Sequence, residues 1–389
     1  MNRRTLWFMT GAVGAIVANV YYIQPLLADI AREFSLSSTG AGAVAMVSQL
    51  GTTCAMLLLV PLGDIRERRA LISLLIVVLA GSLAAMAAAR SVAALCVAAA
   101  VVGASGSVVH LIIPFAAHLA PPKERGRVVG QVIGGLLMGI LLARTLSGWL
   151  GSIAGWRSVY WSACGLMLIL AALTRLCLPK SPPENQLSFG ELARSIIRLV
   201  RDEPELREAS LLGALFFLAF SAFWTTLVFL LETPPYHYGA AAAGMFGLVG
   251  AAGAAGAPLI GRIADRRGPR VTVGAALILG FVSFVFLAVF GHRLAGLIAG
   301  VLLFDLAVQA GHVSNQTRIY NLHPGARSRL NTVYMTCYFI GGSCGSILGA
   351  WAWHVAGWNG VCACGVGAMG LGLLVFRLKT RRLTSSVAA

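Results

Sequence analysis

The sequence has few charged residues and no motif typical of a catalytic or nucleotide-binding site. Only 11% of its 389 residues are charged, and only 14 are Asp or Glu. Soluble domains carry about 25% charged residues, so this composition excludes a soluble enzyme. The eight cysteines show no CxxC spacing, and we find no phosphate-binding loop or nucleophile motif. We therefore expect no metal, no cofactor, no enzymatic activity and no large signalling domain.

Long apolar segments make up most of the chain instead. Hydrophobic residues account for 58% of it, and a membrane-spanning helix needs roughly 20 apolar residues in succession. Eight runs contain no Asp, Glu, Lys or Arg: Thr5–Ala28, Phe34–Gly63, Ala70–Ala89, Ser91–Pro122, Ala209–Leu231, Thr233–Gly261, Val271–His292 and Leu330–Phe376. The last run predicts two spans that separate near Gly357. Together with Val128–Gly151, Ser158–Cys177 and Leu294–Thr317, these runs predict twelve transmembrane helices.

Arginine and lysine concentrate in alternate loops between these spans. With the N-terminus in the cytoplasm, only Arg32, Arg90, Arg157 and Arg293 fall on the outer side, and Arg144 lies within a span. This asymmetry follows the positive-inside rule, which predicts that both termini are cytoplasmic. The rule also explains the net charge of +16, so we expect the lipid bilayer and not a nucleic acid as the macromolecular partner.

The two halves of the sequence repeat each other at a spacing of about 202 residues. The matching pairs are Asp64 with Asp265, Arg125-Gly126-Arg127 with Arg327-Ser328-Arg329, Gly155-Trp156 with Gly357-Trp358, and His110 with His312. The repeat predicts an all-α polytopic membrane protein of two pseudo-symmetric six-helix bundles. We place the bundles at residues 1–178 and 208–389, with a cytoplasmic linker at 179–207.

The linker contains an amphipathic pattern. Arg194, Arg198 and Arg201 fall on one side of a predicted helix, and apolar residues such as Ile196 and Leu199 fall on another. Such a helix either lies on the anionic inner leaflet or is a solvated connection between the bundles, and the pattern does not decide between these alternatives.

The loop after the eighth predicted span resembles a motif of the major facilitator superfamily. Residues 261–270 read Gly-Arg-Ile-Ala-Asp-Arg-Arg-Gly-Pro-Arg, close to the pattern Gly-x-Leu-Ala-Asp-Arg-x-Gly-x-Arg. A weaker copy after the second span keeps Leu62-Gly63-Asp64 and Arg68-Arg69. The resemblance implies the major facilitator fold over the whole chain and a transporter that works by alternating access.

The same resemblance assigns a gating role to residues of both copies. The aspartates would cap a neighbouring helix, and the arginines would form ion pairs that break when the halves move. The alternative is that these residues only orient their loops. The predicted gating residues are Gly63, Asp64, Arg68, Arg69, Gly261, Asp265, Arg266 and Arg270.

Three further stretches are similar to bacterial drug:proton antiporters of the DHA1 type. They are Asn19-Val20-Tyr21-Tyr22-Ile23-Gln24-Pro25-Leu26-Leu27, Ala143-Arg144-Thr145 with Gly148, and Asn315-Gln316-Thr317-Arg318. This similarity implies a monomer in the bacterial inner membrane, with protons and a small molecule as partners. The fifth span contains Gly134, Gly135 and Gly139 but lacks the Gly-Pro pair usual in such antiporters, so the direction of transport stays open.

Two charged residues within spans are candidates for proton coupling, because charge in the hydrocarbon region is costly and is therefore a functional hypothesis. Asp305 lies roughly 16 Å from the outer start of its span, and Arg144 lies roughly 10 Å from the outer end of its own. A pair between them that opens on protonation or substrate binding would couple the two fluxes. Alternatively, Arg144 only bonds to neighbouring carbonyls.

The remaining candidates line the central cavity that the family resemblance implies. His110 and His312 hold equivalent places in the two halves and titrate near neutral pH, so either could bind substrate or relay protons. The others offer aromatic faces or polar groups suited to an amphipathic ligand. These candidates are Asn19, Tyr22, Gln24, Trp224, Gln309, Tyr334 and Tyr338. Helix packing is the alternative role for each.

The sequence thus favours proton-coupled efflux of small amphipathic or drug-like molecules. The second interpretation is a carrier for one specific metabolite, taken up or exported, whose substrate could be anionic because of Arg144.

Overall fold

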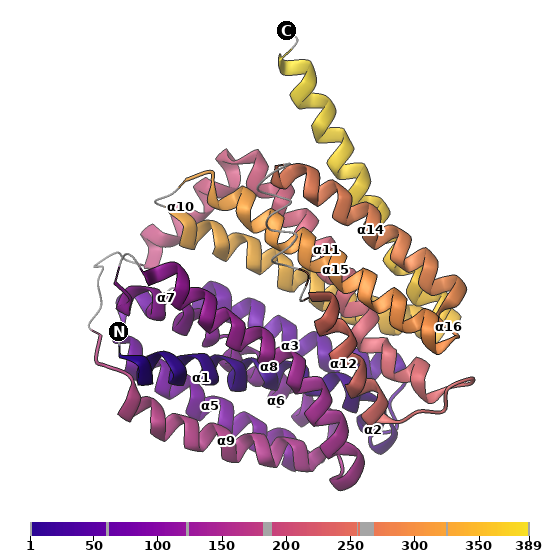
Figure 1. The fold of residues 1–389 in the computed structure, drawn as a ribbon. Coiled ribbons are helices and arrows are strands. Elements are labelled where there is room, and N and C mark those ends of the chain that lie inside the picture. The colour runs from indigo at the N-terminus through magenta and orange to yellow at the C-terminus, as the bar shows by residue number, and fades with distance from the viewer. Residues whose placement is uncertain are drawn as a thin grey trace. The chain divides into compact units, whose positions relative to one another are not determined.

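Helices form nearly all of the described chain, and no strand occurs in it (Figure 1). The computed structural model describes residues 2–59, 62–121, 124–181, 189–254, 256, 268–323 and 326–387. Long apolar runs of Ala, Leu, Val and Gly form these helices. An α-helix satisfies its backbone N–H and C=O groups by internal hydrogen bonds, as the interior of a bilayer requires. The predicted all-α fold class is confirmed.

The chain divides into two compact units. Unit 1 comprises Met1–Phe189 and Tyr238–Leu248, and unit 2 comprises Gly190–His237 and Val249–Ala389. Helix α12 (Ala240–Ala254) therefore begins in unit 1 and ends in unit 2. The bundle boundaries at residues 178 and 208 stay a prediction.

Unit 1 contains nine of the described helices in addition to the start of α12. They are α1 (Arg3–Tyr21), α2 (Ile23–Glu33), α3 (Ser38–Leu58), α4 (Leu62–Ile65), α5 (Arg68–Ala88), α6 (Val92–Gly106), α7 (Val109–Leu119), α8 (Arg125–Ala154) and α9 (Trp156–Cys177).

The helices of unit 2 begin in the linker. They are α10 (Phe189–Asp202), α11 (Pro204–Glu232), α14 (Pro269–Phe290), α15 (Leu294–Tyr320) and α16 (Arg327–Val387). Helix α10 coincides with the amphipathic pattern of the linker. Its Ile197 is 67% exposed, and Ser195 accepts a hydrogen bond from Arg329 of α16.

Each of the twelve predicted spans has a helical counterpart in the described residues. Ten segments are long and apolar enough to cross a membrane, including Arg3–Glu33, which joins α1 to α2, and Val92–Leu119, which joins α6 to α7. The segment Arg329–Leu378 has 50 residues, enough for two passes. The shorter apolar segment Ala240–Gly253 corresponds to the eighth predicted span.

Two of these helical segments are interrupted at identifiable residues. In α16 the helical conformation is lost at Ala356 (φ −138°) and Gly357 (φ 57°), the place where the sequence predicts a break. Between α1 and α2, Pro25 lacks the N–H that would bond to the carbonyl of Tyr21, so the helix bends at Tyr22. The apolar run Thr5–Ala28 predicts one uninterrupted helix, so the bend departs from the expectation.

Small residues bring α11 and α16 into backbone contact within unit 2. A β-carbon added at Gly341 would lie 2.6 Å from the carbonyl carbon of Ala214, and one at Gly345 would lie 2.8 Å from that of Leu218. Only glycine permits this approach, which fixes α16 against the candidate residues of α11.

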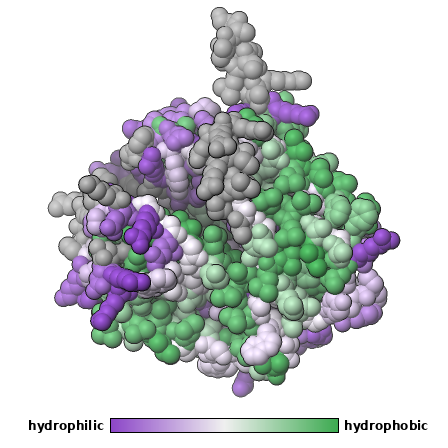
Figure 2. All heavy atoms as spheres, in the orientation of Figure 1, coloured by the Kyte–Doolittle hydropathy of each residue, from purple (hydrophilic) through white to green (hydrophobic). Residues whose placement is uncertain are grey.

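Apolar side chains cover much of the face seen in Figure 2, as expected of a protein surrounded by lipid. Among the described residues, Trp149 and Ile153 of α8 are 59% and 63% exposed, and Leu176 of α9 is 81% exposed. A protein dissolved in water does not tolerate so many large exposed hydrophobic residues.

Candidate transport site

Asp305 is buried within α15, with only 4% of its surface exposed. Trp224 of α11 donates from Nε1 to Asp305 Oδ1 at 3.3 Å. Gly250 of α12 leaves room for the carboxyl group, since a β-carbon there would overlap Asp305 Oδ2. Residues of α11 and α12 in unit 2 thus pack against a carboxyl group inside a candidate membrane span, an arrangement that costs free energy.

Arg144 is equally buried in unit 1, where it is 4% exposed within α8. It donates from Nε to Gln24 Oε1 of α2 at 2.6 Å, and its guanidinium lies 5.0 Å from the ring centroid of Tyr21. Gly247 of α12 also packs against this residue, since a β-carbon there would lie 2.9 Å from Arg144 Cβ. The structure thus joins two predicted site residues, Arg144 and Gln24. The pairing of Arg144 with Asp305 stays a prediction.

Unit 1 contains three further candidates, Asn19, Tyr22 and His110. Asn19 is 2% exposed and donates from Nδ2 to the carbonyl of Ala15 at 2.9 Å, while its Oδ1 has no hydrogen-bond partner. Tyr22 is 9% exposed at the bend between α1 and α2, and His110 is half-buried in α7.

The candidates of unit 2 form an aromatic cluster between α11, α15 and α16. His312 Nδ1 lies 3.1 Å from the hydroxyl of Tyr334, and its ring centroid is 4.7 Å from that of Tyr338. Tyr338 also stacks on Phe217, with ring centroids 4.1 Å apart. Gln309 is half-buried one turn before His312 on α15. This cluster offers flat aromatic faces beside a hydrogen-bonding imidazole, which suits an amphipathic ligand.

The first copy of the predicted gating motif bonds to backbone groups of its own unit. Arg68 donates from Nε to the carbonyl of Gly63 at 3.2 Å. Arg69 donates from Nη1 to the carbonyls of Arg175 and Leu178 at 3.3 and 3.4 Å. These contacts orient the loop beside the end of α9. The side chain of Asp64 lies outside the described part of the chain.

Most of the second copy also lies outside the described residues. This applies to Gly261, Asp265 and Arg266. Arg270, at the start of α14, is described, and its Nη1 lies 3.1 Å from Glu208 Oε2. The gating role of both copies stays a prediction.

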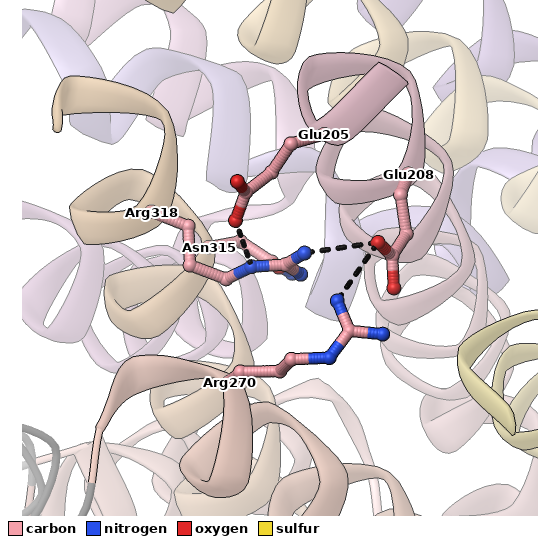
Figure 3. Close-up of polar contacts among 5 residues, drawn as sticks. All are labelled: Glu205, Glu208, Arg270, Asn315 and Arg318. Atoms are coloured by element: carbon pink, nitrogen blue, oxygen red, sulfur yellow. Dashed lines mark hydrogen bonds and ion pairs between the residues drawn. The ribbon is translucent and has the colours of Figure 1, made fainter. Parts of the chain in front are cut away.

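Arg270 belongs to a cluster of charges that the sequence analysis missed (Figure 3). Arg318 of α15 contacts Glu208 Oε2 through Nη2 and Glu205 Oε1 through Nε, both at 3.0 Å. The side chains of Arg318 and Glu208 are 1% and 2% exposed, whereas that of Glu205 is 44% exposed. Asn315 accepts from Arg318 Nη1 at 3.2 Å.

This ion-pair cluster, comprising Glu205, Glu208, Arg270, Asn315 and Arg318, ties α11, α14 and α15 together. Glu208 directly precedes the apolar run Ala209–Leu231, so the sequence placed it only at the end of a predicted span. Its partners lie 62 and 110 residues away. The signal that could have found it is the stretch Asn315-Gln316-Thr317-Arg318, which places an arginine directly after the end of the predicted tenth span.

The described residues contain no group of three or more His, Cys, Asp or Glu side chains arranged to hold a metal ion. All eight cysteines are free. The contacts described at these sites are hydrogen bonds, ion pairs and aromatic contacts.

Comparison with known proteins agrees with this architecture. The family model of the Major Facilitator Superfamily matches residues 7–316 and 237–388. The chain is 44% identical to the "Uncharacterized transporter YgaY" of Escherichia coli O157:H7 over 95% of its own length and 93% of that relative.

Two solved structures share the fold. The bacterial homolog of the human lysosomal transporter Spinster superposes with a TM-score of 0.76 at 16% identity, covering 97% of this chain and 96% of that one. The nucleoside transporter NupG superposes with a TM-score of 0.77 at 13% identity, covering 97% and 99%. With its helical spans and its buried intramembrane charges, the chain belongs to the Major Facilitator Superfamily and is a polytopic membrane transporter.

Proposed function

We propose that this transporter exports small amphipathic molecules in exchange for protons. The observation that carries the proposal is the Asp305 carboxyl group, buried at 4% exposure in a membrane span with Trp224 Nε1 at 3.3 Å. An ionisable group in the hydrocarbon region costs free energy and therefore points to a functional role by default. Proton binding and release at Asp305 would change the relative populations of the two conformations in an alternating-access cycle.

The substrate class follows from the aromatic cluster of unit 2. Phe217 and Tyr338 present stacked rings, and His312 and Tyr334 add hydrogen-bonding groups at its edge. A ligand with one flat apolar part and one polar part would gain from both kinds of contact. In this proposal the termini are cytoplasmic and the protein acts as a monomer in the bacterial inner membrane.

The experiment measures dye accumulation in everted membrane vesicles with an imposed proton gradient. Ethidium and rhodamine serve as cationic amphipathic probes and carboxyfluorescein as an anionic one. We expect gradient-dependent accumulation of at least one cationic dye, and its loss in Asp305→Asn. The matched control is Asp29→Asn, because Asp29 lies near the end of α2 and pairs only with its neighbour Arg32 among the contacts described. Accumulation of no dye would contradict the proposal.

Arg144 favours a second candidate function, transport of a specific anionic metabolite. Its buried guanidinium contacts Gln24 and Tyr21. A guanidinium group can bind a carboxylate or phosphate through two parallel hydrogen bonds, that is, in a bidentate manner. In the same vesicles this candidate predicts transport of carboxyfluorescein but not of the cationic dyes, and loss of that transport in Arg144→Gln.

A further inference from the structure

Five polar residues lie along one face of α15. Asp305, Gln309, His312, Gln316 and Tyr320 follow the spacing i, i+4, i+7, i+11 and i+15, which keeps them on one side of a helix. Asp305 is buried and the other four are half-buried. At a rise of 1.5 Å per residue the face extends for roughly 22 Å, from the buried carboxyl group to the end of the helix.

Side chains of α16 continue this face with hydrogen bonds. The carboxamide oxygen of Asn331 accepts from Gln316 Nε2 at 3.3 Å and from the hydroxyl of Tyr320 at 2.9 Å. One turn further along, His312 Nδ1 meets the hydroxyl of Tyr334 at 3.1 Å. We call the set Asp305, Gln309, His312, Gln316, Tyr320, Asn331 and Tyr334 the polar track.

The polar track is separate from the other polar groups of α15. Asn315 and Arg318 lie on another face of the helix, where they belong to the ion-pair cluster with Glu208. Thr317 donates its hydroxyl to the carbonyl of Val313 in the same helix at 2.9 Å. The ion-pair cluster ties α15 to α11 through a face of the helix different from the one that carries positions 309, 312, 316 and 320.

We propose that the polar track conducts protons between Asp305 and the end of α15 at Tyr320, whose carbonyl accepts from Arg327 Nε at 3.2 Å. This inference rests on the proposed function, because it takes Asp305 as the group that exchanges protons. Successive polar groups on the track are about one turn, roughly 6 Å, apart, a distance that a single water molecule bridges between two side chains. His312 can both accept and donate a proton, and the amides of Gln309, Gln316 and Asn331 would hold the bridging water molecules in place.

The test separates net proton movement from substrate movement. The protein is reconstituted into liposomes and two rates are measured for ethidium: transport driven by a proton gradient, and exchange of labelled for unlabelled ethidium without a gradient. Exchange requires substrate binding and conformational change but no net passage of protons. The variants are Gln316→Leu, Asn331→Leu and Tyr320→Phe, with Thr317→Val as the control one position away on α15.

We expect driven transport to fall about tenfold or more in Gln316→Leu and Asn331→Leu, corresponding to about 1.4 kcal/mol in the barrier, and less in Tyr320→Phe. Exchange should stay near the wild-type rate in all three, which also shows that they fold, and Thr317→Val should be unaffected in both assays. Unchanged driven transport in Gln316→Leu and Asn331→Leu would overturn the inference. So would an equal loss of exchange, because the residues would then bind substrate or support the fold.

The two proposals fail in different ways. If Asp305→Asn abolishes driven transport while the track variants do not, protons reach Asp305 by another route and only the inference is wrong. If the wild-type protein transports ethidium without any dependence on the proton gradient, the proposed function is wrong and the inference falls with it.

Discussion

Gly250 of α12 packs directly against Asp305 of α15. A β-carbon at Gly250 would overlap Asp305 Oδ2 and would lie 2.8 Å from Trp224 Cζ2. A second glycine one turn away, Gly253, lies against the same residue, since a β-carbon there would be 3.1 Å from Asp305 Cβ. The position of the buried carboxyl group therefore depends on the space that Gly250 and Gly253 leave, as well as on its hydrogen bond to Trp224.

Gly250→Ala should displace the Asp305 carboxyl group. Overpacking of a filled site costs about 1–3 kcal/mol, so we expect gradient-driven dye transport to fall about tenfold. Gly81→Ala in α5 is the matched control, because a β-carbon there would meet nothing within 4 Å. Normal transport by Gly250→Ala would mean that the position of Asp305 does not matter for the cycle.

Glu208→Gln should lower the stability of the protein strongly. The change leaves the buried Arg318 with Glu205, which is 44% exposed, as its only carboxylate partner among the described contacts, and a broken buried pair typically costs about 3–5 kcal/mol. Glu205→Gln removes an ion pair on a side chain that is 44% exposed and should cost about 1 kcal/mol or less. Thermal unfolding in detergent measures both, and equal melting temperatures for the two variants would refute a stabilising role for the buried pair.

Glu67 should make the stability of unit 1 depend on pH in the acid range. Its carboxylate caps α5 by accepting from the N–H groups of Arg69 and Ala70, and it also accepts from that of Ser181 at 2.9 Å. Partial burial raises the pKa of Glu67, but these three backbone hydrogen bonds outweigh it and hold the pKa below its ordinary value of 4.5.

A lowered pKa in the folded state means that the stabilisation is complete above pH 4.5 and is lost as the pH falls through the folded-state value. Glu67→Ala should therefore cost about 1 kcal/mol at neutral pH, the usual value of a helix cap. The melting temperatures of the wild type and the variant should converge below pH 4.5. A constant difference between pH 3.5 and 7 would argue against the cap.

Arg144→Lys should impair transport although it keeps the positive charge. Lysine has no Nε–H in the position that donates to Gln24 at 2.6 Å, and it lacks the flat group that faces Tyr21. We expect the Arg144→Lys and Gln24→Leu variants to lose dye transport to a similar extent, and the double variant to lose little more. Additive losses would show that the two residues act independently.

The sequence was sufficient to predict the long apolar helices and the positions of Asp305 and Arg144 within them. Both depend on local composition, because a run of apolar residues defines a span and a charge within it is conspicuous. The partners of these charges could not be predicted in this way. Gln24 and Trp224 lie 120 and 81 residues from Arg144 and Asp305, and their contacts depend on how the helices pack.

The burial of Glu208 was unpredictable for the same reason. Nothing in the residues around it distinguishes a solvated helix end from one covered by Arg270 and Arg318 of two other helices. The bend at Tyr22 could have been predicted from Pro25, but the uniform hydropathy of the segment suggested one straight helix.

Proton movement on addition of substrate tests the role of Asp305 most directly. Liposomes containing the purified protein and a trapped pH indicator are prepared without a proton gradient, and ethidium is then added outside. The account predicts a proton flux opposite to the ethidium flux in the wild type and none in Asp305→Asn, while Asp29→Asn behaves as the wild type. An undiminished proton flux in Asp305→Asn would contradict it.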